Sequence, residues 1–153
     1  MFKRSIIFLL VFSTLGNIIV AQTNHSTTAI MQDQQVTVVY QWTAKPGQPM
    51  ALKAIYSEVE KQMKANEPGA LDVQCYFDEA ARTLVVSDLF ANAEALGFHL
   101  GTTAAAHFPQ LLEIAQPGPF LFCGNIPEEM KQAALGMGLN ATFAPSIFGF
   151  SRE

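Results

Sequence analysis

Three histidines are the first candidates for chemistry, because imidazole is the side chain that exchanges a proton near neutral pH. His25 lies in a polar stretch near the N-terminus, whereas His99 and His107 are eight residues apart with Thr103 midway between them. If one helix continues as far as His107, then His99, Thr103 and His107 share one of its faces. We expect His99 to be the catalytic proton carrier, with Thr103 and His107 beside it in a substrate site. The alternative is that these side chains only support the packing of the helix.

Four aromatic residues are candidates for the wall of that site. Tyr40 and Trp42 alternate along a β-branched stretch, so their side chains lie on the same face of a predicted strand. Tyr76 and Phe90 belong to two further predicted strands. We expect all four to contact a substrate. The alternative is that they pack in the core or at an interface between two copies of the chain, which is a common place for large aromatic side chains.

No motif in the sequence predicts a metal ion or a cofactor. His99 and His107 lack the i, i+4 spacing of a helical metal pair, and no carboxylate joins them. Two cysteines cannot complete a four-ligand structural zinc site unaided. There is neither a phosphate-binding glycine loop nor a Ser-His-Asp motif. A net charge of −4 with only 14% charged residues also disfavours a nucleic-acid partner.

Residues 1–21 have the layout of a secretory signal peptide, with a basic start, an apolar run over residues 6–20 and an alanine before the expected cleavage point. The run is broken by polar residues and is short for a membrane span, so we expect no stable anchor after cleavage. The alternative is an uncleaved anchor. The predicted location is secreted or periplasmic, with residues 22–34 as a flexible tail. In that oxidising compartment, pairing of Cys75 with Cys123 is left open by the sequence.

Hydrophobic periodicity and turn residues predict an alternation of strands and helices. Gly97 and Gly101 fall inside one predicted helix, where they indicate either a close approach of the sheet or of a ligand, or a distorted helix. Pro109 is expected to end that helix and to begin a short one. The expected strands are residues 35–45, 71–77, 83–90, 120–124 and 142–150, and the expected helices are residues 50–66, 93–106, 109–114 and 127–136.

The order β-α-β-β-α-β predicts an α+β, ferredoxin-like split βαβ fold, here with a C-terminal helix-strand addition. Four antiparallel strands would have helices on one face and nothing on the other. Both faces of the first strand carry apolar residues, so we expect a second copy to cover the bare face. A sheet buried on both faces also accounts for the small charged fraction. One of two sets of side chains on that strand faces the helices. The first set is Val36, Val38, Tyr40 and Trp42, and the second set is Thr37, Val39, Gln41 and Thr43.

Three local patterns resemble one known family, the antibiotic biosynthesis monooxygenase family, over residues 36–112. They are Lys-Pro-Gly at residues 45–47, Asn-Glu-Pro-Gly-Ala-Leu at residues 66–71, and Leu-Phe-Ala-Asn-Ala-Glu-Ala at residues 89–95 followed by His99. The resemblance implies that residues 35–153 form a domain of that type. It further implies a homodimeric α+β barrel, with an apolar pocket in each protomer between sheet and helices.

The resemblance also implies a function: cofactor-independent monooxygenation of a quinol or phenolic small molecule, with His99 assisting proton transfer. The predicted export signal is a departure from the family, since many of its members lack one. Such substrates lose a proton to give an anion that reduces dioxygen directly, so the protein supplies a base and a dry, aromatic cavity. The haem-degrading branch is disfavoured, because Tyr40 and Phe90 stand near positions that carry Asn and Trp there. The alternative is a non-catalytic dimeric barrel that binds a small apolar or aromatic ligand, or that is purely structural.

Overall fold

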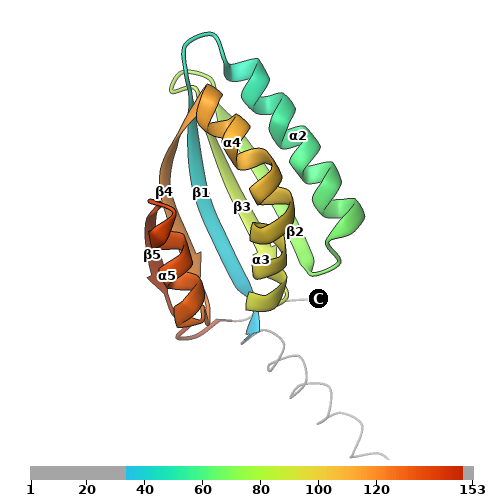
Figure 1. Cartoon of the computed structure of the whole chain (residues 1–153), viewed down its shortest axis with the longest axis vertical. Coiled ribbons are helices and arrows are strands. Elements are labelled where there is room, and N and C mark those ends of the chain that lie inside the picture. Colours follow the sequence, from blue (N-terminus) through green and yellow to red (C-terminus); the bar gives the residue numbers. More distant parts are fainter. Residues whose placement is uncertain (1–33, 150–153) are drawn as a thin grey trace, which may run out of the picture.

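The structure, a computed structural model, describes residues 34–149. The expected signal peptide (residues 1–21) and all but the last residue of the expected tail (residues 22–34) lie outside this part of the chain. The described residues form five strands and a set of helices, and Figure 1 shows how these elements are arranged. They are β1 (Val36–Ala44), α2 (Pro49–Asn66), β2 (Ala70–Asp78), β3 (Thr83–Phe90), α3 (Ala93–His99), the π-helical segment η1 (Leu100–Ala104), α4 (Ala105–Ile114), β4 (Ala115–Cys123), α5 (Glu128–Gly136) and β5 (Asn140–Ala144).

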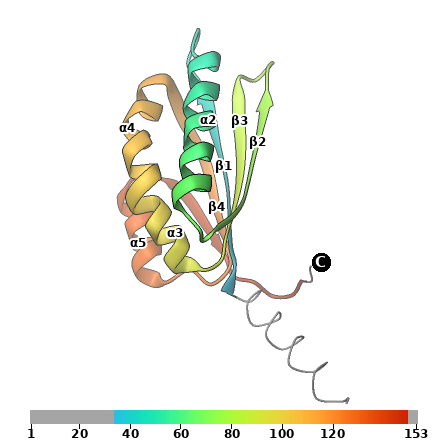
Figure 2. The same ribbon diagram turned by 90° about the vertical axis from the view of Figure 1, so that its right-hand side faces the viewer.

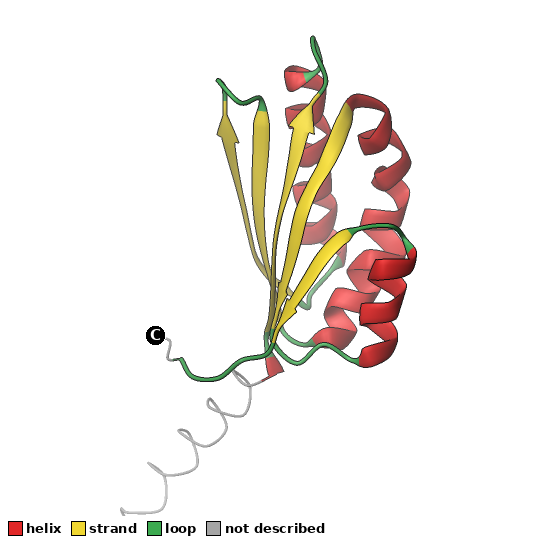
Figure 3. Cartoon of the chain, turned by 90° about the vertical axis from the view of Figure 1, so that its left-hand side faces the viewer, coloured by secondary structure: helices red, strands yellow, loops and turns green. Residues whose placement is uncertain are grey.

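The five strands form one sheet in the order β2-β3-β1-β4-β5. The first four run antiparallel to their neighbours, as the ferredoxin-like prediction requires, and β5 adds a parallel strand beside β4. The helices from α2 to α5 cover the same face of this sheet, and among the described residues no helix covers the other face (Figures 2 and 3). The predicted α+β fold is therefore confirmed, together with its C-terminal helix-strand addition.

Strand β1 shows which face is inward, because its residues alternate between buried and half-buried along its whole length. Val36, Val38, Tyr40 and Trp42 point toward the helices and are at most 8% exposed. Their neighbours in sequence lie on the open face, which also carries Leu121 and the 59% exposed Tyr76. The first of the two candidate sets is thus the core set, and the open face remains available for the predicted second copy.

One continuous helical stretch, α3-η1-α4, runs from Ala93 to Ile114, so the predicted break at Pro109 is wrong. Its start is capped by the side chain of Asn92, whose Oδ1 accepts a hydrogen bond from the backbone N–H of Ala95 at 2.9 Å. A proline inside a helix removes one N–H donor and bends the axis, but packing against the sheet preserves this helix. Gly101 lies in the wide π turn, which confirms the expected distortion. A Cβ on Gly97 would lie 3.3 Å from Met130 of helix α5, so the element that approaches Gly97 is a helix and not the sheet.

Strand β4 begins at Ala115, five residues earlier than predicted, and runs through the Pro-Gly-Pro segment at residues 117–119. β5 pairs with β4 only from Pro119 onward, so the first residues of β4 form a free edge. Pro117 also lies where the β1-β4 register shifts, and proline is tolerated at edges and bulges because no ladder N–H is required there. β5 ends at Ala144, before Pro145, and not at residue 150 as expected.

The two cysteines are free and lie far apart in the sheet. Cys75 is on β2 and Cys123 on β4, with β3 and β1 between them. Three strand spacings correspond to about 14 Å, well beyond the ~7 Å that a disulfide can bridge. A pair within one chain is therefore excluded in this fold. No helix among residues 34–149 has the length and apolar character needed to cross a bilayer.

Candidate functional site

A cavity of about 270 Å³ lies between the inner face of the sheet and the helices α2, α3, η1 and α4. Its walls are mostly hydrocarbon and aromatic ring, and a few polar groups interrupt them: the hydroxyls of Tyr40 and Tyr56, the carboxyl of Asp88 and the imidazole of His99. The chain beyond α4 closes one side of the cavity, with Phe120 and Phe122 from β4 and Met137 and Leu139 from the connection between α5 and β5. An apolar cavity with few polar groups is typical of a site for a small organic ligand.

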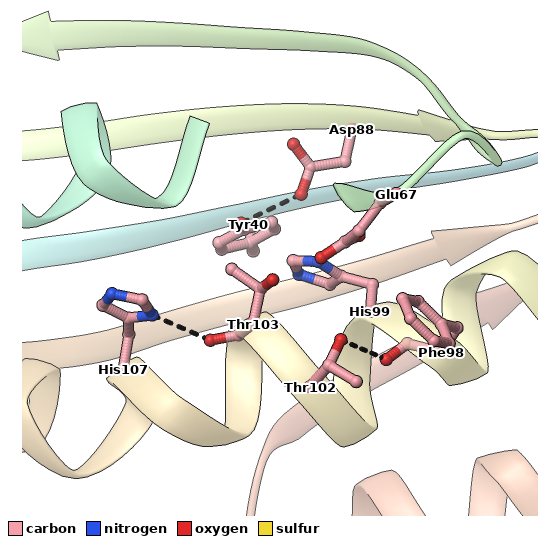
Figure 4. A network of polar contacts seen from close by, with 8 residues as sticks. All are labelled: Tyr40, Glu67, Asp88, Phe98, His99, Thr102, Thr103 and His107. Atoms are coloured by element: carbon pink, nitrogen blue, oxygen red, sulfur yellow. Dashed lines mark hydrogen bonds and ion pairs between the residues drawn. The ribbon is translucent and has the colours of Figure 1, made fainter. Parts of the chain in front are cut away.

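His99, the last residue of α3, forms a buried pair with Glu67, and their side chains face each other in Figure 4. The Nδ1 atom of His99 lies 3.0 Å from Oε2 and 3.3 Å from Oε1 of Glu67. Both residues are at most 5% exposed. Because a carboxylate accepts hydrogen bonds and cannot donate them, Nδ1 carries the proton of this bond. The lone pair of the neutral ring is therefore on Nε2, which makes Nε2 the basic atom of this site.

The loop between α2 and β2 places Glu67 beneath α3. The backbone N–H of Glu67 donates to the carbonyl of Met63 at 2.9 Å and ends α2. Two residues later, the carbonyl of Gly69 accepts from the N–H of Ala91 at 2.9 Å, which ties the loop to the end of β3. A Cβ on Gly69 would lie 2.5 Å from the Cβ of Ala95 in α3. Only glycine therefore allows the loop to approach α3 closely enough for the pair to form.

Burial lowers the pKa of His99, and the charge and hydrogen bond of Glu67 act in the opposite direction. The ring is thus held neutral near physiological pH, while the adjacent carboxylate stabilises the protonated ring once a proton arrives. The imidazole also packs at a tilt on Phe90, with 5.4 Å between ring centroids. This arrangement fixes the orientation of the ring, as the carboxylate partner of a general-base histidine does in other enzymes.

Asp88, on β3, is a second buried carboxyl group in the cavity wall and is 1% exposed. Its Oδ2 accepts a hydrogen bond from the hydroxyl of Tyr40 at 3.0 Å (Figure 4). Its Oδ1 has no hydrogen-bond partner among residues 34–149. Burial raises the pKa of Asp88 to about 7, the negative charges of Glu67 and Asp72 add to this rise, and the Tyr40 hydrogen bond opposes it. Near neutral pH the group therefore exists in both protonation states.

The aromatic side of the cavity is rigidly packed. Tyr40 stacks on Phe120 with 5.0 Å between centroids, and Trp42 makes edge contacts with Phe108 and Phe120. Burial raises the pKa of Tyr40 and of Tyr56, so both remain neutral phenols. The indole N–H of Trp42 has no hydrogen-bond partner in the described chain.

The structure brings some of the predicted site residues together and separates others. His99, Tyr40, Trp42 and Phe90 all line the cavity. Thr103 and His107 lie on the same buried helix face as His99, but they do not line the cavity; Nδ1 of His107 donates to the carbonyl of Thr103 at 2.9 Å. Tyr76 is on the open face of the sheet, because it is paired with Val85 and both side chains point away from the helices.

Sequence reasoning missed Glu67, Asp88 and Tyr56. The pattern of β3 contained a signal for Asp88, because alternation places it on the same face as Leu84, Val86 and Phe90. Tyr56 follows Leu52 at helical spacing on the buried face of α2. Glu67 has no such signal, since its partner His99 is 32 residues away. Within the described chain, no group of three or more His, Cys, Asp or Glu side chains is placed to hold a metal ion.

Comparison with known proteins identifies relatives of this architecture. The family model of the antibiotic biosynthesis monooxygenases matches residues 35–111. MupZ from Pseudomonas fluorescens superposes with a TM-score of 0.66 at 18% identity, covering 78% of this chain and 95% of MupZ. A candidate antibiotic biosynthesis monooxygenase from Caulobacter crescentus superposes with a TM-score of 0.56 at 20% identity, covering 67% of this chain and 100% of that protein. A variant of SnoaB, a cofactor-independent oxygenase from Streptomyces nogalater, superposes with a TM-score of 0.51 at 15% identity, covering 58% of this chain and 90% of the SnoaB chain. No curated protein matches the chain.

Proposed function

Since the chain belongs to the antibiotic biosynthesis monooxygenase family, we propose that it is a cofactor-independent monooxygenase acting on a quinol or another phenolic small molecule. The observation that carries this proposal is the imidazole of His99 in the wall of an apolar cavity, with its Nδ1 hydrogen-bonded to Glu67. A neutral imidazole with a fixed tautomer is the group needed to take a proton from a phenol. The structural likeness to SnoaB supports the same class of reaction.

The first step of the proposed reaction is proton transfer from the phenol to Nε2 of His99. Glu67 stabilises the resulting imidazolium through the bond that it already makes to Nδ1. The phenolate is rich in electrons and reduces dioxygen directly. With a phenol, one oxygen atom becomes the second carbonyl oxygen of a quinone, and the other leaves as water with the two hydrogen atoms that the phenol loses. With a quinol, one oxygen atom converts a ring C–H to C–OH on the resulting quinone, and the other leaves as water with the two hydroxyl hydrogens of the quinol. The apolar walls exclude water and so protect the anion and the reduced oxygen from side reactions.

Oxygen uptake tests this proposal on the purified full chain with a panel of phenols and hydroquinones. Replacement of the base, His99→Ala, should lower the rate by about 100-fold or more, which is the usual contribution of a general base. His107→Gln is the matched control, because His107 is also a buried histidine but does not line the cavity. It should retain a rate within a few-fold of wild type. Turnover at the wild-type rate in His99→Ala would remove the base from the mechanism.

The second candidate function is binding of a small aromatic ligand without turnover. It is favoured by Tyr40 and Phe90, which stand near the positions that carry Asn and Trp in the haem-degrading branch. The cavity therefore lacks the residues that are typical of that reaction. Native mass spectrometry of the purified chain distinguishes the two candidates. A retained ligand that is stable under oxygen supports binding alone, whereas conversion of that ligand supports the monooxygenase.

We also propose that the protein is a homodimer and that it is secreted or periplasmic. The open sheet face, with Leu121 and Tyr76 exposed on it, is the surface that a second copy would cover. Export rests on residues 1–21 alone. Size-exclusion chromatography with light scattering tests the dimer, and cell fractionation of the expressed full chain tests the location. A stable monomer or a cytoplasmic protein would contradict the respective proposal.

A further inference from the structure

Asp88 is a buried carboxyl group in the cavity wall that has no part in the proton transfer from the phenol to His99. Its side chain is 1% exposed, and one of its two oxygens, Oδ1, has no hydrogen-bond partner in the described chain. A buried carboxyl oxygen without a donor is unfavourable when the group is ionised, and proteins rarely retain one without a function. Oδ1 is therefore the atom at which Asp88 can hold or release a proton.

Two tyrosines fix the other oxygen of Asp88. The hydroxyl of Tyr40 donates to Oδ2 at 3.0 Å, and the side chain of Tyr56 is in turn hydrogen-bonded to Tyr40 (Figure 4 shows the first of these bonds). Burial raises the pKa of both phenols, so neither loses its proton near neutral pH. This chain of hydroxyl groups holds the carboxyl group in place and leaves Oδ1 as the oxygen for proton exchange.

Asp88 and His99 line the same cavity and are coupled electrostatically through Glu67. His99 packs on Phe90, and Asp88 is two residues from Phe90 on the same face of β3, which is about 7 Å along the strand. Burial raises the pKa of Asp88 to about 7, and the negative charge of Glu67 adds to this rise. When His99 takes a proton, its positive charge offsets that of Glu67, whose Oε2 lies 3.0 Å from Nδ1. Asp88 thus becomes a stronger acid once His99 holds the substrate proton.

We propose that Asp88 is a second catalytic residue, which gives a proton to the reduced oxygen and then removes the proton from the ring carbon that has been oxygenated. This inference rests on the proposed function, since it adds a residue to the same reaction. After the phenol has lost its proton, the reaction still needs an acid for the peroxide and a base for the ring C–H bond. A carboxyl group whose pKa is close to the working pH can serve as both.

Each proton and electron pair has a place in this sequence. The phenolate forms a bond from a ring carbon to dioxygen, which becomes a peroxide anion, and Asp88 protonates its terminal oxygen. The carboxylate of Asp88 then removes the proton of that ring carbon, the C–H electron pair completes a carbonyl group, and the O–O bond breaks. The departing hydroxide takes the proton from His99 and leaves as water. The ring proton replaces the one that Asp88 gave, so both side chains return to their initial states.

The sequence also keeps the net charge of the buried side chains constant. Before the reaction, Glu67 is ionised, His99 is neutral and Asp88 is protonated. At the hydroperoxide stage, both carboxyl groups are ionised and the imidazole is protonated, so the sum of the three charges is the same. Net charge is costly in a cavity that excludes water, and a base and an acid that change state together avoid adding any.

The two roles of Asp88 predict pH dependences of opposite sign. Complete oxygenation begins with protonated Asp88, so its rate should fall as the pH rises above about 7. Elimination from a supplied hydroperoxide begins with the ionised group and should become faster over the same range. Burial lowers the pKa of His99, so this base stays neutral there. The groups that face Asp88 are Tyr40 from β1, Tyr56 from α2, Glu67 after α2, and Asp72 and Cys75 from β2.

Tetralin hydroperoxide tests the elimination without dioxygen, because it carries a hydrogen on its oxygenated carbon and a base converts it to tetralone and water. The purified full chain should accelerate this conversion under argon, more strongly at pH 8 than at pH 6, and deuterium at that carbon should slow it. Asp88→Asn keeps the shape of the acid but cannot take the proton, so it should lower the rate by about 100-fold or more. Asp78→Asn, at an exposed carboxyl group of β2, is the matched control and should retain a rate within a few-fold of wild type.

The outcomes separate this inference from the proposed function. Conversion by the wild-type chain at the rate of buffer alone overturns the assignment of Asp88, even if oxygen uptake still depends on His99. The assignment is equally overturned by a rate that Asp88→Asn leaves unchanged, by one that falls as the pH rises, or by a loss of activity in Asp78→Asn. The pH and deuterium effects are measured on the wild-type chain and do not depend on the folding of a variant. Elimination that requires Asp88, together with oxygen uptake that is independent of His99, supports Asp88 and overturns the proposed base.

Discussion

Replacement of Asp88 by asparagine should make the protein more stable at neutral and higher pH. Asparagine has the shape and the neutral charge of the protonated acid, so it removes the cost of ionising a buried carboxyl group. The pKa of Asp88 is raised from 3.8 to about 7, chiefly by burial. The folded state therefore binds the Asp88 proton more tightly than the unfolded state does, and the wild-type protein loses stability as the pH rises between these two values.

The magnitude follows from the size of that shift. A rise of about three pKa units at 1.36 kcal/mol per unit corresponds to about 4 kcal/mol. The wild-type protein should therefore lose about 1.4 kcal/mol per pH unit relative to Asp88→Asn between about pH 4 and pH 7. The two proteins should be nearly equal in stability below that window, and the difference should be constant above it.

Urea denaturation at half-unit steps from pH 4 to pH 8.5 measures this difference, with fluorescence of the single tryptophan, the fully buried Trp42, as the signal. His99 acts with the opposite sign, because its lowered pKa makes the folded state gain stability as the pH rises toward 6.5. That contribution is common to both proteins and cancels in the comparison. A difference that does not change with pH would show that Asp88 ionises normally, and the reasoning from its burial would be wrong.

Substitutions at four other positions test the site and the sheet. Glu67→Ala leaves the buried Nδ1 of His99 without a partner and should cost about 1–3 kcal/mol of stability. Glu67→Gln keeps an acceptor and should cost less. Equal losses of unfolding free energy in the two variants, measured by denaturation, would contradict the hydrogen bond. Gly69→Ala forces a contact that is too short with α3 and should cost about 1–3 kcal/mol. Gly101→Ala meets open space in a helix and should gain up to about 1 kcal/mol, so thermal melting should shift in opposite directions for these two variants. Leu121→Glu places a charge on the open face and should convert a dimer to a monomer in light scattering without unfolding the chain; an unchanged mass would exclude that face as the interface.

The fold was predictable from the sequence wherever its signals are local. β3 begins and ends at residues 83 and 90 as predicted, because strict alternation and a turn define it. The helix through Pro109 and the early start of β4 were not predicted, because tertiary packing overrides the local preference of proline. The site shows the same division. His99 could be selected from the sequence because of its residue type. Its hydrogen bond to Glu67 and the hydrogen bond between Tyr40 and Asp88 could not be predicted, because they join residues that are 32 and 48 positions apart.

The closure of the cavity by the chain beyond α4 has a consequence for how this protein could diversify. The proposed reactive groups, Glu67, Asp88 and His99, all lie within residues 35–111, the part that matches the family model. Part of the wall that shapes the ligand comes from residues beyond this part, between Phe120 and Leu139. The proposed reactive groups are thus encoded in the first stretch, and the second stretch adds part of the wall around the ligand. Mutation or recombination of the second stretch can change which molecule binds in the cavity, while Glu67, Asp88 and His99 remain unchanged.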